Sequence, residues 1–203
     1  MPIKQNLETT RKTPRQNRAT STVEALVEAA FQVLERDGGE RFGTTAVAER
    51  AGVSIGTLYQ YFSRKEDLLV AVARRELRAL LAGIERELSE PPGAQRVRAV
   101  ARAVLGAFRQ AAAGRRASLG LLLAYVDRGE IAAEARAFTS ELARELSGQR
   151  QLGAEAAFVL TRAVLGVASA ALTEDQALSP QRLEDELVLL IQSYLGAGAA
   201  QNL

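Results

Sequence analysis

The sequence predicts an all-α protein of about nine helices, and three features of the chain support this fold class. Apolar residues recur at spacings of three and four along most of the chain, as on one face of an amphipathic helix. Glycine or proline separates the apolar segments, for example at residues 38–39, 91–93 and 179–180. No stretch shows the alternating apolar pattern of a strand. The length of 203 residues suits one large or two small domains.

The composition argues against most enzyme chemistry. The chain has no cysteine and no histidine. A disulfide framework and a thiolate metal site are therefore excluded, and the commonest general base and metal ligand is missing. We expect no catalytic residues, no metal site, no cofactor and no enzyme activity. An enzyme that uses carboxylates alone is a less favoured alternative.

The hydropathy pattern gives no sign of a membrane protein. No run of about 18 apolar residues is free of charges, and the polar N-terminus has no apolar signal-peptide core. We therefore expect a cytoplasmic location and no membrane partner.

The first predicted helix begins at Ser21. Residues 1–20 are polar and have no apolar period, so a flexible arm is expected there. The arm is basic, because residues 1–22 contain five Lys or Arg side chains against one acidic residue, Glu8. Ser21 and Glu24 have the spacing of a capping box. An apolar stripe follows and ends at residues 38–39.

Residues 44–66 predict two short helices joined by a tight turn. Gly52 stands where a chain that leaves a helix needs positive φ. Ser54 is a good N-cap for the second helix, over residues 55–61. Leu58 shares the inward face of that helix with the aromatic residue four positions later, so Gln60 projects outward. Two helices joined by a glycine-containing turn are typical of a helix-turn-helix that reads DNA.

A specific set of residues surrounds this turn. It comprises Phe42, Thr45 and the runs 48–54, 56–62 and 65–69. With these residues, the stretch from about 20 to 70 resembles the DNA-binding region of the tetracycline-repressor (TetR) family of transcriptional regulators. The resemblance implies a three-helix DNA-binding unit over residues 21–68, after the arm of residues 1–20. It also implies a helical domain over residues 69–203 that binds an effector and dimerises.

Base contacts are expected from the outward side of the second helix. The candidates are Ile55, Gly56, Thr57 and Gln60. Gln60 can bind adenine through two hydrogen bonds, and Gly56 lets the backbone approach the DNA. Ile55 departs from the family, which often has a basic or polar residue there, and its apolar side chain suits a thymine methyl.

Phosphate contacts follow from the resemblance and from the helix ends. The resemblance implies Tyr59, Lys65 and a hydroxyl from Thr44 or Thr45. Lys65 also lies in a first helical turn, where free N–H groups favour an anion. Tyr59 has an alternative role as a cover for the core, and Tyr61 an alternative place partly within it. The expected DNA-binding residues are Thr44, Thr45, Ser54, Ile55, Gly56, Thr57, Tyr59, Gln60, Tyr61 and Lys65. The basic arm lies next to this unit in the sequence. We therefore favour a role for the arm in binding DNA phosphates, with a solvated tail as the alternative.

Four further helices are predicted before residue 147. A long helix over residues 64–88, begun by a Ser63–Glu66 capping box, joins the two domains and acts as a rigid lever. The others cover residues 95–113, 119–126 and 130–146. Phe42 is expected to pack under the three-helix unit, beside Phe31, Val47, Leu58 and Phe62.

The last two helices, over residues 154–172 and 180–195, are expected to form a homodimer. The first of them is apolar on nearly every face, and Arg162 is the only charged residue between Glu155 and Glu174. Such a helix must bury every face, which favours a partner subunit. The resemblance implies the same interface, and a dimer binds a palindromic DNA site more tightly than one subunit does.

An effector pocket is expected between the fifth and eighth helices. Its candidate lining residues are Val104, Phe108, Leu122, Tyr125, Phe138, Phe158 and Arg162. Each apolar candidate has core packing as its alternative. For Arg162, which is expected to be buried, a salt bridge to Asp127 or to the partner subunit is favoured over an anionic effector group.

Together with these observations, the resemblance implies a sequence-specific DNA-binding regulator, a repressor that a small-molecule effector releases from a palindromic operator. Its expected partners are double-stranded DNA, a second copy of the chain and the effector, on the nucleoid of a bacterial cell. One alternative is a protein that coats DNA without regard to sequence. Another is a TetR-like regulator without an effector.

Overall fold

The computed structural model describes residues 14–88, 95–109, 115–147, 152–173 and 179–196. In these segments the chain forms nine helices and no strands, which confirms the all-α prediction. The helices are α1 (Pro14–Arg41), α2 (Thr44–Ala51), α3 (Ile55–Tyr61), α4 (Lys65–Leu88), α5 (Gln95–Arg109), α6 (Arg115–Tyr125), α7 (Gly129–Ser147), α8 (Ala154–Thr173) and α9 (Pro180–Gly196). The arm over residues 1–13, the predicted stop at 91–93 and the predicted helix end at 110–113 lie outside the described residues.

Helix α1 begins earlier than the sequence predicted. It starts at Pro14, so residues 14–20 are helical rather than part of a flexible arm. The Ser21 hydroxyl donates to the carbonyl of Arg18 at 2.9 Å, which a mid-helix serine does and an N-cap does not. Proline is favoured in the first turn of a helix, where its missing N–H is not needed. The predicted break is present, because Gly38 has a non-helical φ of 76°.

The core of the N-terminal unit forms as predicted. Phe42, Val47, Leu58 and Phe62 are buried in one cluster with the apolar stripe of α1. Phe31 is partly buried and packs against the same cluster. The cluster fixes α2 and α3 on α1, so the orientation of the outward face of α3 is determined by burial of its inward face.

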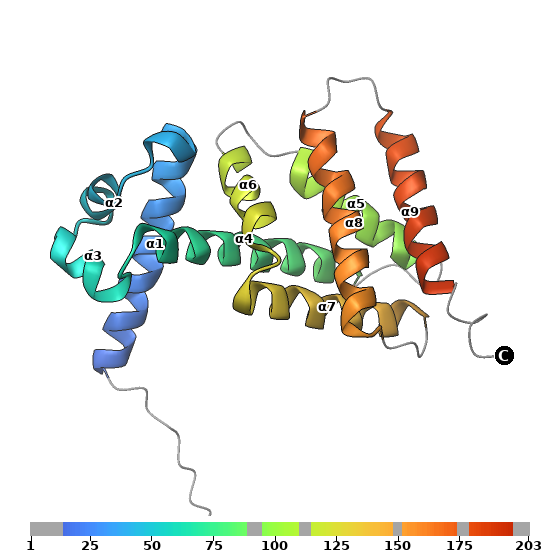
Figure 1. The fold of residues 1–203 in the computed structure, drawn as a ribbon, viewed down its shortest axis with the longest axis horizontal. Helices are drawn as coiled ribbons and strands as arrows, with labels where there is room; N and C mark the ends of the chain where they lie inside the picture. Colours follow the sequence, from blue (N-terminus) through green and yellow to red (C-terminus); the bar gives the residue numbers. More distant parts are fainter. Residues whose placement is uncertain (1–13, 89–94, 110–114, 148–151, 174–178, 197–203) are drawn as a thin grey trace, which may run out of the picture.

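Helix α4 runs through both parts of the molecule (Figure 1). Leu68 and Val72 belong to the N-terminal cluster, whereas Leu77 and Ile84 belong to the C-terminal cluster. The predicted Ser63–Glu66 capping box is wrong. The backbone N–H of Arg64 instead donates to Asp67 at 3.1 Å, so the helix begins one residue later. The shorter carboxylate of Asp67 reaches back to the helix start from the third helical position.

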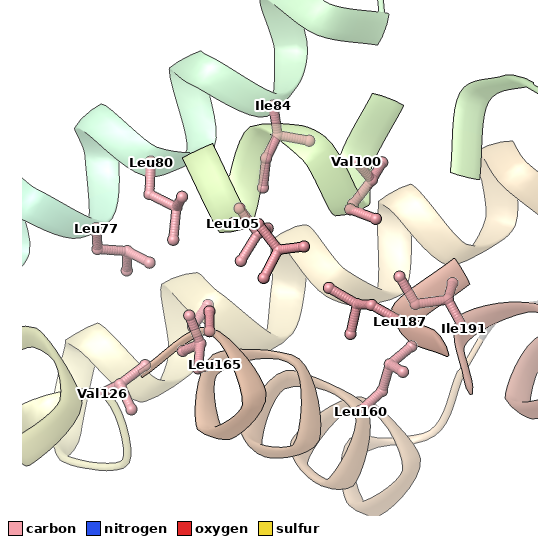
Figure 2. Packing of buried hydrophobic residues seen from close by; sticks show 14 of the residues in the cluster. Leu77, Leu80, Ile84, Val100, Leu105, Val126, Leu160, Leu165, Leu187 and Ile191 are labelled. Atoms are coloured by element: carbon pink, nitrogen blue, oxygen red, sulfur yellow. The ribbon is translucent and has the colours of Figure 1, made fainter. Parts of the chain in front are cut away.

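The C-terminal helices surround a second core. Helix α5 packs against α4, α8 and α9, and α7 packs against α4 and α8. Helices α8 and α9 lie at the end of the molecule opposite α2 and α3 (Figure 1). Figure 2 shows the buried leucines, isoleucines and valines of this core. Among the described residues, no helix is long and apolar enough to cross a membrane.

The two cores meet around α6, which packs on both α1 and α4. Ala117 and Leu121 of α6 contact the N-terminal cluster. Glu76 of α4 is 3% exposed and accepts a hydrogen bond from Arg115 of α6 at 3.2 Å. A buried carboxylate needs such a partner, because desolvation of an unpaired charge is costly. The pair therefore connects α4 to α6 where the two hydrophobic cores meet.

Replacement of Arg115 is expected to destabilise the protein. Arg115→Met leaves the buried Glu76 carboxylate without its partner and should lower the free energy of unfolding by about 2 kcal/mol. Urea unfolding followed by circular dichroism measures this. Arg116→Met, at an exposed position next to it on α6, is the control and should change stability by less than about 0.5 kcal/mol. Equal stability of the two variants would show that the buried pair has no structural role.

Candidate nucleic-acid interface

The turn between α2 and α3 has the geometry of a tight helix-turn-helix. Gly52 adopts φ 69° and ψ 30°, the left-handed conformation that favours glycine. Its N–H donates to the carbonyl of Glu49 at 3.1 Å, and the N–H of Val53 donates to that of Ala48 at 3.0 Å. This pair of bonds is a Schellman motif, which satisfies the last carbonyls of α2. The turn therefore holds α3 in a fixed direction relative to α2.

Ser54 caps α3 as predicted. Its Oγ accepts a hydrogen bond from the backbone N–H of Thr57 at 3.0 Å, and the two side-chain hydroxyls lie 2.9 Å apart. A serine at this position stabilises a short helix by satisfying one of its free donors. The hydroxyls of both candidate residues are thus engaged in local bonds, although Ser54 remains exposed.

The outward face of α3 carries the side chains that the sequence assigned to it. Ile55 is 41% exposed, and Gly56 and Gln60 are exposed as well. Thr57 is half-buried. This surface therefore offers one apolar side chain, Ile55, and one amide side chain, Gln60, to a molecule that binds there. This surface fits the edges of bases in a major groove, where thymine offers a methyl group and adenine a donor and an acceptor.

Two tyrosines stand at the surface of α3. Tyr59 is 48% exposed and Tyr61 38% exposed, so both side chains reach the surface while part of each residue stays covered. The Tyr59 hydroxyl lies 3.2 Å from Oγ1 of Thr44, within hydrogen-bonding distance. This contact joins the start of α2 to α3 and brings two hydroxyl groups to one place. Thr45 is exposed beside them.

The first turn of α2 leaves backbone donors without a side-chain cap. The N-cap residue is Gly43, which makes no side-chain hydrogen bond. The first N–H groups of a helix have no partner within the helix and favour an anion. Thr44 and Thr45 occupy this turn, so their hydroxyls flank those donors.

Lys65 and its neighbour Arg64 form the basic edge of the unit. The Lys65 ammonium lies 5.5 Å from the centroid of the Phe42 ring, which holds the stem of Lys65 over the core. Arg64 pairs with Asp67 at 3.0 Å, and its side chain is 72% exposed. Asp67 raises the pKa of this guanidinium through its hydrogen bond and charge, so Arg64 keeps its positive charge. Sequence reasoning missed Arg64, although its position next to Lys65 was a usable signal.

A cavity of about 80 Å³ lies in the C-terminal domain, with walls from α4, α5, α7, α8 and α9. Of the predicted pocket residues, Val104 and Phe138 line it. Phe108 and Leu122 are fully buried in the core, and Tyr125 of α6 packs against the core, so these three do not line this cavity. Helix α6 contributes none of the described residues that line this cavity. Helices α4 and α9 contribute instead, because they close the two sides of the bundle.

Phe158 and Arg162 also lie outside the cavity. Phe158 is 42% exposed, and the side chain of Arg162 is 41% exposed, so the expected burial of Arg162 is wrong. Its favoured partner is present, because Arg162 pairs with Asp127 at 3.4 Å. Helix α8 is apolar on nearly all faces, and its sequence therefore did not indicate which face turns inward.

The outer faces of α8 and α9 expose large apolar side chains. Val159 is 48% exposed and Leu189 58% exposed, in addition to Phe158. Leu189 also lines a groove, together with Val167, Leu183, Glu186, Leu187, Leu190, Ser193 and Tyr194. An exposed apolar groove of this kind is typical of a protein interface.

The fold defines an all-α helix-turn-helix protein with a larger helical part behind its N-terminal unit. Residues 26–72 match the model of the bacterial regulatory proteins of the tetR family. Over these residues the chain is similar to the DNA-binding region of that family.

Known relatives share mainly the N-terminal unit. The chain is 39% identical over 61 residues to the HTH-type transcriptional repressor KstR of Mycolicibacterium smegmatis, which covers 30% of each chain. It is 29% identical over 65 residues to the fatty acid metabolism regulator protein of Bacillus subtilis, covering 32% of this chain and 34% of that protein. The matches therefore span about a third of the length of these curated relatives.

A solved structure resembles nearly the whole fold. A TetR-family transcriptional regulator from Streptomyces coelicolor superposes with a TM-score of 0.66 at 20% identity, covering 87% of this chain and 98% of that one. At this identity the likeness supports the fold alone, including the helical arrangement of the C-terminal domain.

Proposed function

We propose that this chain is a sequence-specific DNA-binding transcriptional regulator, a homodimeric repressor that a small-molecule effector releases from a palindromic operator. The observation that carries the proposal is the capped, exposed helix α3, held by a rigid turn on a buried core. The N-terminal unit is similar to KstR, which is named a transcriptional repressor, and this likeness supports DNA binding by this unit.

In the proposed complex, α3 enters the major groove. Gln60 and Ile55 read base edges there, and Gly56 allows a close approach of the backbone. Thr44, Tyr59 and the basic residues Arg64 and Lys65 at the start of α4 hold phosphates on either side of the groove. Phosphate contacts supply affinity and orientation, whereas base contacts supply sequence preference.

The proposed dimer forms through α8 and α9. Their exposed apolar residues lie at the end of the molecule farthest from α3 (Figure 1). Burial of Phe158, Val159 and Leu189 against a second copy removes apolar surface from water. Two reading helices fixed in one dimer bind two half-sites about one DNA turn apart.

Helix α4 provides the proposed coupling between effector and DNA. Its residues Leu77, Leu80 and Ile84 line the cavity, whereas Leu68 packs under the DNA-binding unit. A ligand that binds better to one arrangement of α4 shifts the population of dimers toward that arrangement. Effector and operator then weaken each other by the same factor.

A salt bridge network on α4 adds a pH dependence to this part of the fold. Glu134 of α7 accepts hydrogen bonds from Arg74 at 2.9 Å and from Arg78 at 3.0 Å. Partial burial raises the pKa of Glu134, but the hydrogen bonds and charges of Arg78 and Arg74 outweigh burial and hold this pKa below its ordinary value. The network therefore stabilises the fold above the unfolded pKa of Glu134, about 4.3.

Acid is expected to remove this stabilisation. As the pH falls from about 4.3 through the lower folded pKa, Glu134 becomes protonated and its contribution to the free energy of unfolding is lost. Glu134→Gln should flatten the pH dependence of stability in this range and lower stability at pH 7. Urea unfolding at a series of pH values measures both effects. Glu141→Gln, an exposed residue on the same helix, is the control. Parallel pH curves for Glu134→Gln and the unchanged protein would contradict the proposed role.

Selection of bound sequences from a random DNA pool tests the proposed function. The expected winner is palindromic, with half-site centres about 10 base pairs apart. A pool without enrichment would overturn sequence-specific regulation and favour a protein that coats DNA.

A further inference from the structure

The walls of the C-terminal cavity are almost entirely apolar. Figure 2 shows Leu77, Leu80 and Ile84 projecting from α4 toward Leu160 and Leu165 of α8, and all five line the cavity. Among the described residues of the lining, two have polar side chains and none carries a charge. A ligand in this cavity therefore meets no ionic partner from the described part of the wall.

The two polar residues are a hydrogen-bonded pair. Oγ1 of Thr139 on α7 lies 2.7 Å from Oγ1 of Thr161 on α8. The Thr139 hydroxyl also donates to the carbonyl of Ala135 at 3.0 Å. Because a hydroxyl has one hydrogen, the Thr161 hydroxyl must donate to Thr139. Thr161 Oγ1 thus retains acceptor capacity for a ligand in the cavity.

We infer that this cavity binds an uncharged, mainly apolar molecule that carries a hydroxyl group. This inference rests on the proposed function, whose effector it assigns to a chemical class. The ligand hydroxyl donates to Thr161 Oγ1, and the rest of the ligand packs against aliphatic side chains. A carboxylate or an ammonium group at the same depth is desolvated without a partner, which disfavours both.

The size of the cavity indicates how a ligand affects the fold. Its volume of about 80 Å³ is smaller than the roughly 150 Å³ of an engineered cavity that binds benzene. A chain of eight carbons therefore displaces wall side chains when it binds. Leu81 of α4 and Phe138 of α7 are partly buried wall residues, so their side chains have room to move outward. Outward movement of these two side chains makes room for the ligand between α4 and α7.

Calorimetric titration of the full chain with three matched probes tests the ligand class. The probes are 1-octanol, octanoate and octylammonium at pH 7, which share a chain length and differ in charge. Octanol is expected to bind on the order of 100-fold more tightly than either ion. Binding of octanoate or octylammonium as tight as that of octanol would overturn the inference, and so would a failure of octanol to bind.

Two variants test the position of the ligand. Thr161→Val keeps the shape of the side chain and removes the acceptor, so octanol should bind about tenfold more weakly. Ala143→Leu places a larger side chain in the wall and should abolish binding; Ala143 is a buried lining residue of α7. Thr22→Val on α1, far from the cavity, is the matched control and should leave octanol binding unchanged. Equal octanol affinities for Thr161→Val and Thr22→Val would place the ligand elsewhere, whether or not Ala143→Leu folds.

The titration is independent of DNA, so it separates this inference from the proposed function. If octanol binds as expected and a DNA duplex from the selection stays bound, the ligand class holds and effector-controlled release fails. If octanol does not bind and the duplex is recognised specifically, the ligand class fails and DNA recognition stands.

Discussion

Leu189→Glu is expected to convert the proposed dimer into a monomer and to lower the affinity for a palindromic duplex at least about 100-fold. Leu189 is 58% exposed on α9, so the substitution leaves the core of the single chain unchanged. In the proposed dimer the same position is buried against a partner, where an unpaired carboxylate is strongly disfavoured. A monomer places only one α3 on the DNA and loses the advantage of two linked half-sites.

Sedimentation and DNA-binding titrations measure the two effects of Leu189→Glu together. Gln192→Glu adds the same charge at another exposed position of α9, outside the lining of the apolar groove, and should remain dimeric. Circular dichroism verifies that both variants are folded. A dimeric Leu189→Glu variant with unchanged DNA affinity would exclude this face as the interface.

Gln60→Ala and Lys65→Ala are expected to weaken DNA binding in different ways. Loss of the Gln60 amide should cost about 1–3 kcal/mol on the selected duplex and almost nothing on random DNA, because base contacts carry the sequence preference. Loss of the Lys65 charge should weaken binding to both DNAs alike and reduce the salt dependence by about one phosphate contact.

The two substitutions are compared by titration of labelled duplexes at several salt concentrations. Gln60 is exposed, and Lys65 lies at the rim of the unit over Phe42, so neither change removes a buried core residue. Gln192→Ala, on α9 at the far end of the molecule, is the control and should match the unchanged protein. A Gln60→Ala variant that loses affinity equally for selected and random DNA would remove Gln60 from base reading.

Most helices could be predicted from the sequence because strong local signals mark them. Gly52 adopts the left-handed conformation that the turn requires, and Ser54 caps α3 with its own side chain. Both features therefore depend on a few neighbouring residues, which the sequence shows directly. The start of α1 was missed because residues 14–20 form a helix without an apolar period. The cap of α4 was assigned to Glu66, whereas Asp67 makes the bond. Glu66 and Asp67 both lie in the first turn of α4, so the sequence alone could not show which of them makes the bond.

The cavity was harder to predict than the helix-turn-helix. Helix α8 is apolar on nearly every face, so its sequence was compatible with either Phe158 or Leu160 toward the interior. Packing of α5, α7 and α9 around α8 decides this, and it turns Leu160 inward and Phe158 outward. Arg162 follows Phe158 to the outer face, where Asp127 neutralises it. Long-range packing of this kind has no local sequence signal.

Equilibrium binding of the full chain to the selected duplex and to a scrambled duplex of the same composition tests sequence-specific recognition by α3. At a salt concentration of about 0.15 M, we expect two chains to bind the selected duplex at least about 1000-fold more tightly than the scrambled one. Affinity for both duplexes should fall as salt rises. If the two duplexes bound with equal affinity, and both affinities fell alike as the salt concentration rose, this would contradict sequence-specific recognition by α3.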